Sequence, residues 1–452
     1  MDNVVVVVFD TARFDVFSKL LSNGHLPTLK RVAKAGGFIE NAVSNAPWTV
    51  PSHGSMFTGE YPAEHGITGK DPTYVNGPPL VYELSSAGYH TLGFSANPWL
   101  SSEFGFDQGF DTFLYKLDYL ANGPGMIDIA RLPTVQQQLS GLAQSLRESL
   151  LPTAVNFFHS MYWTRQSKDT GAKTLCSRAK EYIQKAPGPY FAFFNFTEPH
   201  LAYSLPSQYL PNRVSKQDLE TTNQDATALN IGEVSMSSDE IATLRSVYES
   251  TFKYLDDQLA TLFESIDLDR TTVVILGDHG ELFGENGKLG HQYSLNHNLL
   301  RVPLIVSDGK DRFSCNDTLV ETRQVYDFIR QVAGLSDHEK LGSPHAIAEY
   351  VSPHPSLEEM QQRRPDRLPE RITWYADGAR SILSANGRQL IENADGQVVT
   401  DGVSKAGDAD VLNDYDSLQR TLLDERGEFE PPSGEYEVSR SVESQLEELG
   451  YK

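Results

Sequence analysis

Short apolar segments, rich in β-branched and aromatic residues, alternate along the chain with segments of helical period. The apolar segments are VVVVVF (4–9), TLGFSA (91–96), YFAFFNF (190–196), TVVILG (272–277) and PLIVS (303–307). Helical segments between them include 27–36 and the long, charged 239–266. Each apolar segment is too short to span a membrane and has the length of a strand buried on both faces. The alternation predicts an α/β fold with a central, mostly parallel, doubly wound sheet flanked by helices.

The alternation is interrupted at 115–175, where two amphipathic segments (134–150 and 153–165) supply no strand, and we expect a helical insertion or cap there. After about residue 336 the sequence is polar and punctuated by proline. Four short runs follow, separated by DG and NG turns: RITWYAD (371–377), ARSILSA (379–385), RQLIEN (388–393) and QVVTD (397–401). We therefore expect a larger α/β domain at 1–335 and a smaller C-terminal subdomain at 336–452. The subdomain should hold an antiparallel sheet, an acidic tail and a last helix at 438–452.

The charge balance restricts the partners of the chain. Asp and Glu number 61 against 38 Lys and Arg, for a net charge of -23. No basic surface is evident for nucleic acid. The acidity fits either a solvated surface or adaptation to high salt, as in halophiles. Two cysteines, Cys176 and Cys315, provide no disulfide framework. No apolar run reaches eighteen residues, so no transmembrane segment is expected and a cytoplasmic location is predicted, while the oligomeric state stays open.

Polar residues stand where two of the predicted strands end. The first strand ends at Asp10, and the strand at 272–277 ends at Asp278-His279-Gly280-Glu281. Ligands of doubly wound sheets bind at the carboxyl ends of the strands. Carboxylates and an imidazole there would suit a divalent cation. The alternatives are that Asp10 caps a helix and that the DHG sequence forms a turn.

The segment APWTVPSHGSMFTGEYPAEHG (46–66) predicts a short helix near the same edge. Pro51 suits the first helical position and Gly59 the C-terminal end, which places Thr49 or Val50 at the helix entrance. Thr49 could serve only as the N-cap. Alternatively it is a nucleophile, activated by a divalent cation that Asp10, Asp278 and His279 hold.

Six blocks, in order over about residues 3–335, carry a family resemblance. They are VVVFDTARFD, the block at 46–66, SANPWLSSEFGFDQGFDTF (95–113), FNFTEPHLAY (194–203), ILGDHGELFGENGKLGHQ (275–292) and LLRVPLIV (299–306). Together they resemble the sulfatase-like branch of the alkaline phosphatase superfamily. The resemblance implies a catalytic α/β domain over 1–335, a smaller C-terminal sheet, and metal-assisted hydrolysis or transfer of an anionic phosphate or sulfate ester.

The resemblance also implies roles for particular residues. The metal ligands would be Asp10, Thr49, Asp278 and His279, with Thr49 also the nucleophile. His200, Lys288 and His291 would hold the ester oxygens or protonate the leaving group. One divalent ion (Mn, Mg, Zn or Ca) is favoured. A second ion is possible, bound in part by Glu198, His200 and His291.

Two departures from the family pattern bear on the chemistry. Sulfatases carry C-x-P-S-R or S-x-P-S-R, in which the Cys or Ser is oxidised to formylglycine; here the segment reads Thr49-Val50-Pro51-Ser52-His53. Threonine cannot give that aldehyde, so no formylglycine is expected. Thr11 stands where many sulfatases have a second aspartate, which favours a smaller ion than calcium.

The sequence therefore favours cleavage of a phosphate ester, a diester above others, through Thr49. The alternatives are a sulfatase that works without formylglycine and a non-catalytic module that binds anions.

Overall fold

The computed structural model describes residues 2–118, 120, 129, 134–166, 171–222, 224–308, 318–337, 340–365, 368–401 and 409–427. Within these residues a central eight-stranded sheet has the strand order β10-β2-β9-β6-β1-β5-β3-β4. Its strands are β1 (Asn3–Phe9), β2 (Gly37–Val43), β3 (His90–Ser95), β4 (Thr112–Tyr115), β5 (Tyr190–Phe196), β6 (Thr271–Gly277), β9 (Arg301–Ser307) and β10 (Val320–Glu321). Only β9 runs antiparallel to its neighbours, β2 and β6. The mostly parallel sheet predicted from the sequence is confirmed.

Strand β1 shows why this sequence forms a central strand. It pairs in parallel with both β5 and β6. Val4, Val6 and Val8 face one hydrophobic core, while Val5, Val7 and Phe9 face another. An unbroken apolar run is required because both faces are covered. Strand β2 escaped prediction because its register shifts between Ile39 and Ala42, which breaks the alternation of apolar residues.

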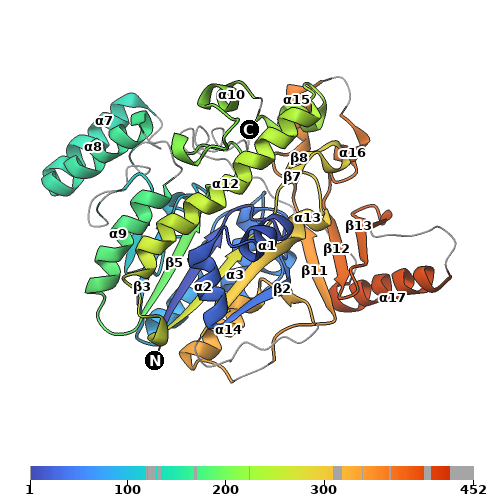
Figure 1. Cartoon of the computed structure of the whole chain (residues 1–452), viewed down its shortest axis with the longest axis horizontal. Helices are drawn as coiled ribbons and strands as arrows, with labels where there is room; N and C mark the ends of the chain where they lie inside the picture. Colours follow the sequence, from blue (N-terminus) through green and yellow to red (C-terminus); the bar gives the residue numbers. More distant parts are fainter. Residues whose placement is uncertain are drawn as a thin grey trace.

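Helices cover both faces of the sheet (Figure 1). One core is lined by α1 (Phe14–Ser22), α2 (Pro27–Ala35), α9 (Ala172–Lys185) and α12 (Ser238–Phe263). The other is lined by α3 (Thr49–Thr58), α5 (Pro79–Ser86) and α14 (Gln324–Ala333). Shorter helices lie in the connections: α4 (Pro62–His65), α10 (Lys216–Thr221), α11 (Ala226–Ile231), α13 (His297–Leu300), α15 (Leu357–Arg363), α16 (Glu370–Thr373), and the 3-10 turns η1 (Ser102–Phe104), η2 (Ser207–Tyr209), η3 (Leu268–Arg270) and η4 (Glu285–Gly287).

The predicted helical pair forms α7 (Val135–Glu148) and α8 (Leu150–Gln166). The two helices pack against each other at one side of the molecule (Figure 1). Their role as an insertion or cap stays a prediction. None of the described helices is long and apolar enough to cross a lipid bilayer.

A second, antiparallel sheet lies in the C-terminal part, with the order β11 (His345–Tyr350), β12 (Ala379–Ser384), β13 (Gln389–Asn393) and β14 (Val398–Asp401). Three of its strands match the predicted runs. The prediction for 371–377 is wrong, because helix α16 begins there after Pro369 and β11 is the fourth strand instead. Part of the expected acidic tail forms α17 (Ala409–Arg426). The predicted helix at 438–452 lies outside the described residues.

Helix α2 is capped by a residue distant in sequence. Its N-cap residue, Leu26, offers no side-chain acceptor. The buried Asp256 of α12 accepts hydrogen bonds from the backbone N–H groups of Thr28 (3.0 Å) and Leu29 (2.8 Å) instead. These are two of the N–H groups that a helix leaves unsatisfied at its start. Asp256 therefore fixes α2 against α12 and beside the sheet.

We predict that Asp256→Ala lowers the free energy of unfolding by about 2 kcal/mol, because two buried N–H groups lose their acceptor. Urea denaturation followed by circular dichroism measures the change. The neighbouring Asp257→Ala is the control; Asp257 is exposed, and its bond to the Tyr209 hydroxyl lies at the surface. Equal stability of the two variants would contradict the capping role.

Candidate active site

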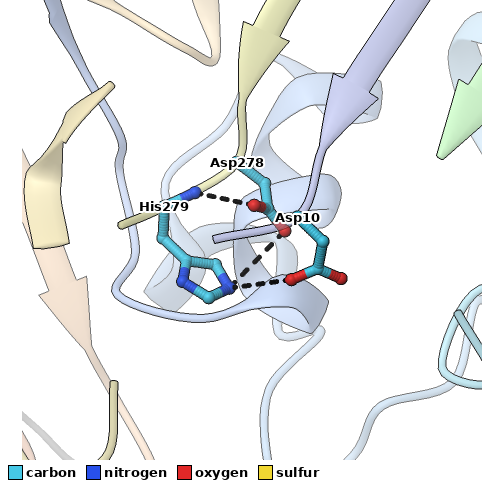
Figure 2. Close-up of side chains that lie close together, drawn as sticks. All are labelled: Asp10, Asp278 and His279. Carbon is cyan, nitrogen blue, oxygen red and sulfur yellow. Dashed lines mark hydrogen bonds and ion pairs between the residues drawn. The ribbon is translucent and has the colours of Figure 1, made fainter. Parts of the chain in front are cut away.

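Two aspartates meet at the carboxyl end of the central sheet. Asp10 follows β1 and Asp278 follows β6, and these strands are parallel neighbours with Phe9 opposite Gly277. His279 comes next along the chain. One ligand atom from each of Asp10, Asp278 and His279 lies within 4.8 Å of the other two, and all three residues are buried (Figure 2). The sequence prediction that these strand ends converge is confirmed.

Hydrogen bonds leave one atom of each side chain directed at the common centre. Asp278 Oδ1 accepts from the backbone N–H groups of Thr11 (3.0 Å) and His279 (2.8 Å), while Asp278 Oδ2 is buried and has no hydrogen-bond donor among the described residues. His279 Nδ1 lies 2.9 Å from the Gly280 carbonyl and must donate to it. The lone pair of His279 is therefore on Nε2, which lies 3.6 Å from Asp10 Oδ1 and 3.5 Å from Asp278 Oδ2 (Figure 2).

Gly280 makes this turn possible. A Cβ atom at this position would lie 2.0 Å from the Asn298 carbonyl oxygen, so no side chain fits. The backbone N–H of Gly280 donates to the Leu299 carbonyl (2.7 Å). The glycine thus lets the segment after β6 pass close to α13 and hold the imidazole over the two carboxylates.

The electrostatics of the cluster fit a divalent cation. Burial raises the pKa of Asp10 to about 7, against the lowering effect of the Asn97 hydrogen bond, and the charge of Glu281 raises it further. Burial and then the charge of Asp10 raise the pKa of Asp278 well above its usual range. Burial holds the pKa of His279 well below 6.5, so its imidazole is neutral. Two buried carboxylates beside a neutral imidazole repel each other unless a cation lies between them. The oxygen and nitrogen donors suit Mg²⁺, Mn²⁺ or Zn²⁺.

Helix α3 brings Thr49 to this cluster. Thr49 Oγ1 lies 3.4 and 3.5 Å from the two carboxylate oxygens of Asp10 and 3.5 Å from His279 Nε2. The helix begins at Thr49, with Trp48 as the N-cap residue, and ends at Thr58. Gly59 follows as the C-cap residue with a left-handed φ of 79°, which confirms that Gly59 ends the helix. The expected position of Pro51 is therefore wrong, while the expected place of Thr49 at the helix entrance is confirmed. Pro51 is the third helical residue, and Thr49 is the first residue rather than the cap.

The position of α3 depends on aromatic contacts around Trp48. Its ring packs edge to face on Trp99 (centroids 5.8 Å apart) and stacks on His354 (5.6 Å). His53 reaches back one turn, with Nδ1 2.9 Å from the Thr49 carbonyl and 3.7 Å from Asp278 Oδ2. Burial lowers the pKa of His53 to about 3, so it is a neutral donor to the helix. His53 thus holds the backbone of Thr49 in place.

Asn97 is a site residue that the sequence did not single out. Its Nδ2 donates to Asp10 Oδ2 (2.6 Å) and lies 3.4 Å from Thr49 Oγ1. It follows β3, the strand beyond β5 from β1. The signal was present, because Asn97 stands just after a predicted strand. A lone amide after a strand is also typical of a turn, so the position of Asn97 in the sequence does not by itself indicate a site residue.

His200 and His291 lie on one side of the cluster. The His291 ring is 4.6 Å from the His279 ring and 5.2 Å from the His200 ring, between centroids. His291 Nδ1 lies 3.5 Å from the buried Glu281 Oε1, and His200 Nδ1 donates to the Leu201 carbonyl. Burial lowers the pKa of each of these histidines to about 3 and raises that of Glu281 to about 7.

Lys288 and Glu198, which were also predicted to lie in the site, make their contacts away from Asp10, Asp278 and His279. Lys288 Nζ donates to the Tyr293 carbonyl and lies 4.6 Å from the centre of the Tyr375 ring. Within the described residues, no hydrogen bond or ion pair joins the side chain of Lys288 to Asp10, Thr49, Asp278 or His279. Glu198 Oε1 accepts from the backbone N–H of Ala172 (2.8 Å) at the start of α9. Glu198 therefore serves a helix terminus, and a role in a second metal site gains no support from this contact.

The pKa of Asp10 gives a test of the buried cluster. Between about pH 4 and pH 7, the metal-free folded protein keeps a proton on Asp10 that the unfolded chain releases, so this residue makes stability fall as pH rises. Without metal, the free energy of unfolding of Asp10→Asn minus that of wild type should therefore rise by on the order of 1.4 kcal/mol per pH unit over this range. The buried histidines, whose pKa values are lowered, make stability rise with pH instead. Because both proteins contain these histidines, their contribution cancels when the two free energies of unfolding are subtracted.

Urea denaturation of both proteins in EDTA from pH 4.5 to 7.5 measures this difference. With Mn²⁺ in place of EDTA the order should reverse at pH 7.5, because Asp10→Asn loses a charged ligand. A difference that does not vary with pH in EDTA would contradict the raised pKa of Asp10.

Comparisons with known proteins agree with this geometry. The sulfatase family model matches residues 2–337. A choline-sulfatase of Rhizobium meliloti (strain 1021) is 20% identical over 333 residues, covering 68% of this chain and 62% of that protein, so the chain spans less than two thirds of the length of this relative.

Two solved structures share the fold. The phosphonate monoester hydrolase from Silicibacter pomeroyi is 19% identical with a TM-score of 0.64, and 95% of this chain and 96% of that chain are covered. The phosphonate monoester hydrolase of Agrobacterium radiobacter is 15% identical with a TM-score of 0.66, and the coverage is 94% and 95%. The family model extends over most of the chain. The chain therefore belongs to the sulfatase family.

Proposed function

We propose that this chain cleaves a phosphate ester, with a diester as the preferred substrate, and that Thr49 is the nucleophile. The observation that carries the proposal is the position of Thr49 Oγ1, within 3.5 Å of both Asp10 and His279 at the N-terminal end of α3. Hydroxyl nucleophiles need help to ionise near neutral pH. The positive end of the α3 dipole and a cation held by the neighbouring carboxylates would both stabilise the ionised hydroxyl of Thr49.

Asp10, Asp278, His279 and Thr49 would hold one divalent ion. When bound, such an ion supplies positive charge that favours the ionised form of Thr49 and polarises the ester. Asn97 orients Asp10 through its 2.6 Å hydrogen bond and keeps an amide N–H near Thr49 Oγ1. The start of α3 adds partial positive charge beside the transferred phosphoryl group.

The two neighbouring histidines fit the proton transfers. In the first step Thr49, which has released its hydroxyl proton to solvent, forms a bond from Oγ to phosphorus, the bond from phosphorus to the leaving oxygen breaks, and that oxygen takes a proton. His291 suits this role because Glu281 lies beside its Nδ1 and an incoming anionic ester raises the pKa of the imidazole. His200 donates through Nδ1 to Leu201, so its Nε2 can accept a proton from the water that cleaves the phosphothreonine in the second step.

Thr49→Val tests the nucleophile while keeping the shape of the side chain. We expect turnover to fall by at least about a thousand-fold, because the covalent step is lost, with the metal content unchanged or lowered only in part. Steady-state kinetics and elemental analysis of the purified protein measure the two quantities. Thr58→Val, at the far end of α3, is the control and should retain activity. If Thr49→Val is about as active as Thr58→Val, Thr49 is not the nucleophile.

A sulfatase that uses Thr49 without formylglycine is the second candidate. The printed name of the curated relative, choline-sulfatase, favours it. Relative rates on an aryl phosphodiester, an aryl phosphate and an aryl sulfate with the same leaving group separate the two candidates. We expect kcat/KM to be highest for the diester. A higher kcat/KM for the sulfate than for the diester would favour the sulfatase over the phosphodiesterase. No turnover of any ester with any divalent ion would favour a non-catalytic anion-binding module.

A further inference from the structure

Lys288 and Arg371 form a pair of cations that the proposed mechanism leaves unused. Lys288 is 3% exposed and precedes β8 (Leu289–Gly290), which pairs with β7 (Leu282–Phe283). Its ammonium group contacts the Tyr293 carbonyl and the Tyr375 ring. Within the part of the chain that the structure describes, no carboxylate forms an ion pair with Lys288. A buried ammonium group without a carboxylate is unusual in a protein with 61 acidic residues.

Arg371 is held beside Lys288 through Asn230. Arg371 Nη2 donates to the Asn230 carbonyl (2.9 Å), and the Asn230 side chain exchanges two 2.9 Å hydrogen bonds with the backbone of Leu289, the residue after Lys288. Helix α16, which carries Arg371, accordingly lies near β7 and β8 (Figure 1). Arg371 lies beyond residues 2–337, so it belongs to the part of the chain that the family model does not match.

A structural role alone does not account for Arg371. Its bond to Asn230 satisfies a carbonyl at the C-terminal end of α11, and this is a common use of arginine. That bond uses one of five donors, and Arg371 Nε is buried with no hydrogen-bond partner among the described residues. The nearby Arg363 differs, because it pairs with Asp225 and Glu233. Arg371 therefore retains donors for an acceptor from outside the chain.

The cation pair is close to the proposed reaction centre along the chain. Lys288 is three residues before His291, whose ring lies 4.6 Å from that of His279. Three residues span at most about 11 Å. Burial and then the charge of Arg371 lower the pKa of Lys288 to about 7, and an anion between the two cations would oppose both effects.

We propose that Lys288 and Arg371 bind a second oxyanion of the substrate, so that the chain selects esters whose leaving group carries a carboxylate or a further phosphate group. This inference rests on the proposed phosphoester site and deepens it. Both oxyanions accept the forked hydrogen bonds that a guanidinium group donates. An uncharged leaving group would leave the buried Lys288 and the half-buried Arg371 without an anionic partner.

Titration calorimetry with three benzylphosphonates, which cannot be hydrolysed at the carbon–phosphorus bond, tests the subsite. They carry a para carboxylate, a para phosphonomethyl group or a para methoxycarbonyl group, and the full chain is titrated in the presence of Mn²⁺. For wild type we expect at least one charged ligand to bind about ten-fold or more tightly than the neutral ester, the size expected for one charge-assisted hydrogen bond. The tighter charged ligand identifies which oxyanion the subsite prefers.

Arg371→Gln should lower this charged-to-neutral affinity ratio about ten-fold, and Lys288→Met should lower it independently. Arg363→Gln, an arginine with carboxylate partners, should keep the wild-type ratio. Circular dichroism establishes that each variant is folded. Equal affinity of wild type for the charged and neutral ligands, or a ratio unchanged in both variants, would overturn the subsite alone. Failure of all three ligands to bind wild type would overturn the subsite together with the phosphoester site.

Discussion

Two carboxylates that lie buried side by side, Asp10 and Asp278, are the constraint on which the rest of the site depends. Parallel pairing of β1 with β6 brings them together, and burial raises the pKa of both. Such a pair is unfavourable when both groups are ionised and no cation is near. The surrounding residues reduce this penalty: Thr11 and His279 donate N–H groups to Asp278, and Asn97 donates to Asp10. The remaining acceptor atoms are directed toward one point with His279 Nε2.

The fold holds this arrangement from two opposite ends of the chain. The central sheet supplies the carboxylates, and α3 supplies Thr49 through an anchor at Trp48 that includes His354 from the C-terminal part. Residues of β11, β12 and β13 also belong to the hydrophobic core that α3 contacts. The C-terminal sheet therefore packs where it can influence both Thr49 and, through α16, the approach to Lys288.

Much of this could be predicted because buried parallel strands leave a strong pattern: long apolar runs that stop at polar residues. Asp10, Asp278 and His279 were found in this way, and Thr49 through its place in a short segment between Trp48 and Gly59. Asn97 and Arg371 could not be found, because Asn97 is a single polar residue in a connection and Arg371 lies in a one-turn helix, so neither belongs to a periodic pattern. The exact start of α3 also escaped prediction, since packing of Trp48 on Trp99 and His354 decides it rather than local propensity. Similarly, the run at 371–377 reads as a strand locally but begins a helical turn after Pro369.

The claim that Thr49 carries the transferred group can be tested most directly by trapping it. A turnover mixture with an aryl phosphodiester, quenched in acid on the millisecond scale, would be digested and the peptide that contains Thr49 sequenced by mass spectrometry. We expect a phosphoryl ester adduct on Thr49 that appears and decays with turnover. If turnover is rapid but Thr49 is unmodified at every quench time, Thr49 is not the nucleophile. An adduct on another residue would exclude Thr49 in the same way.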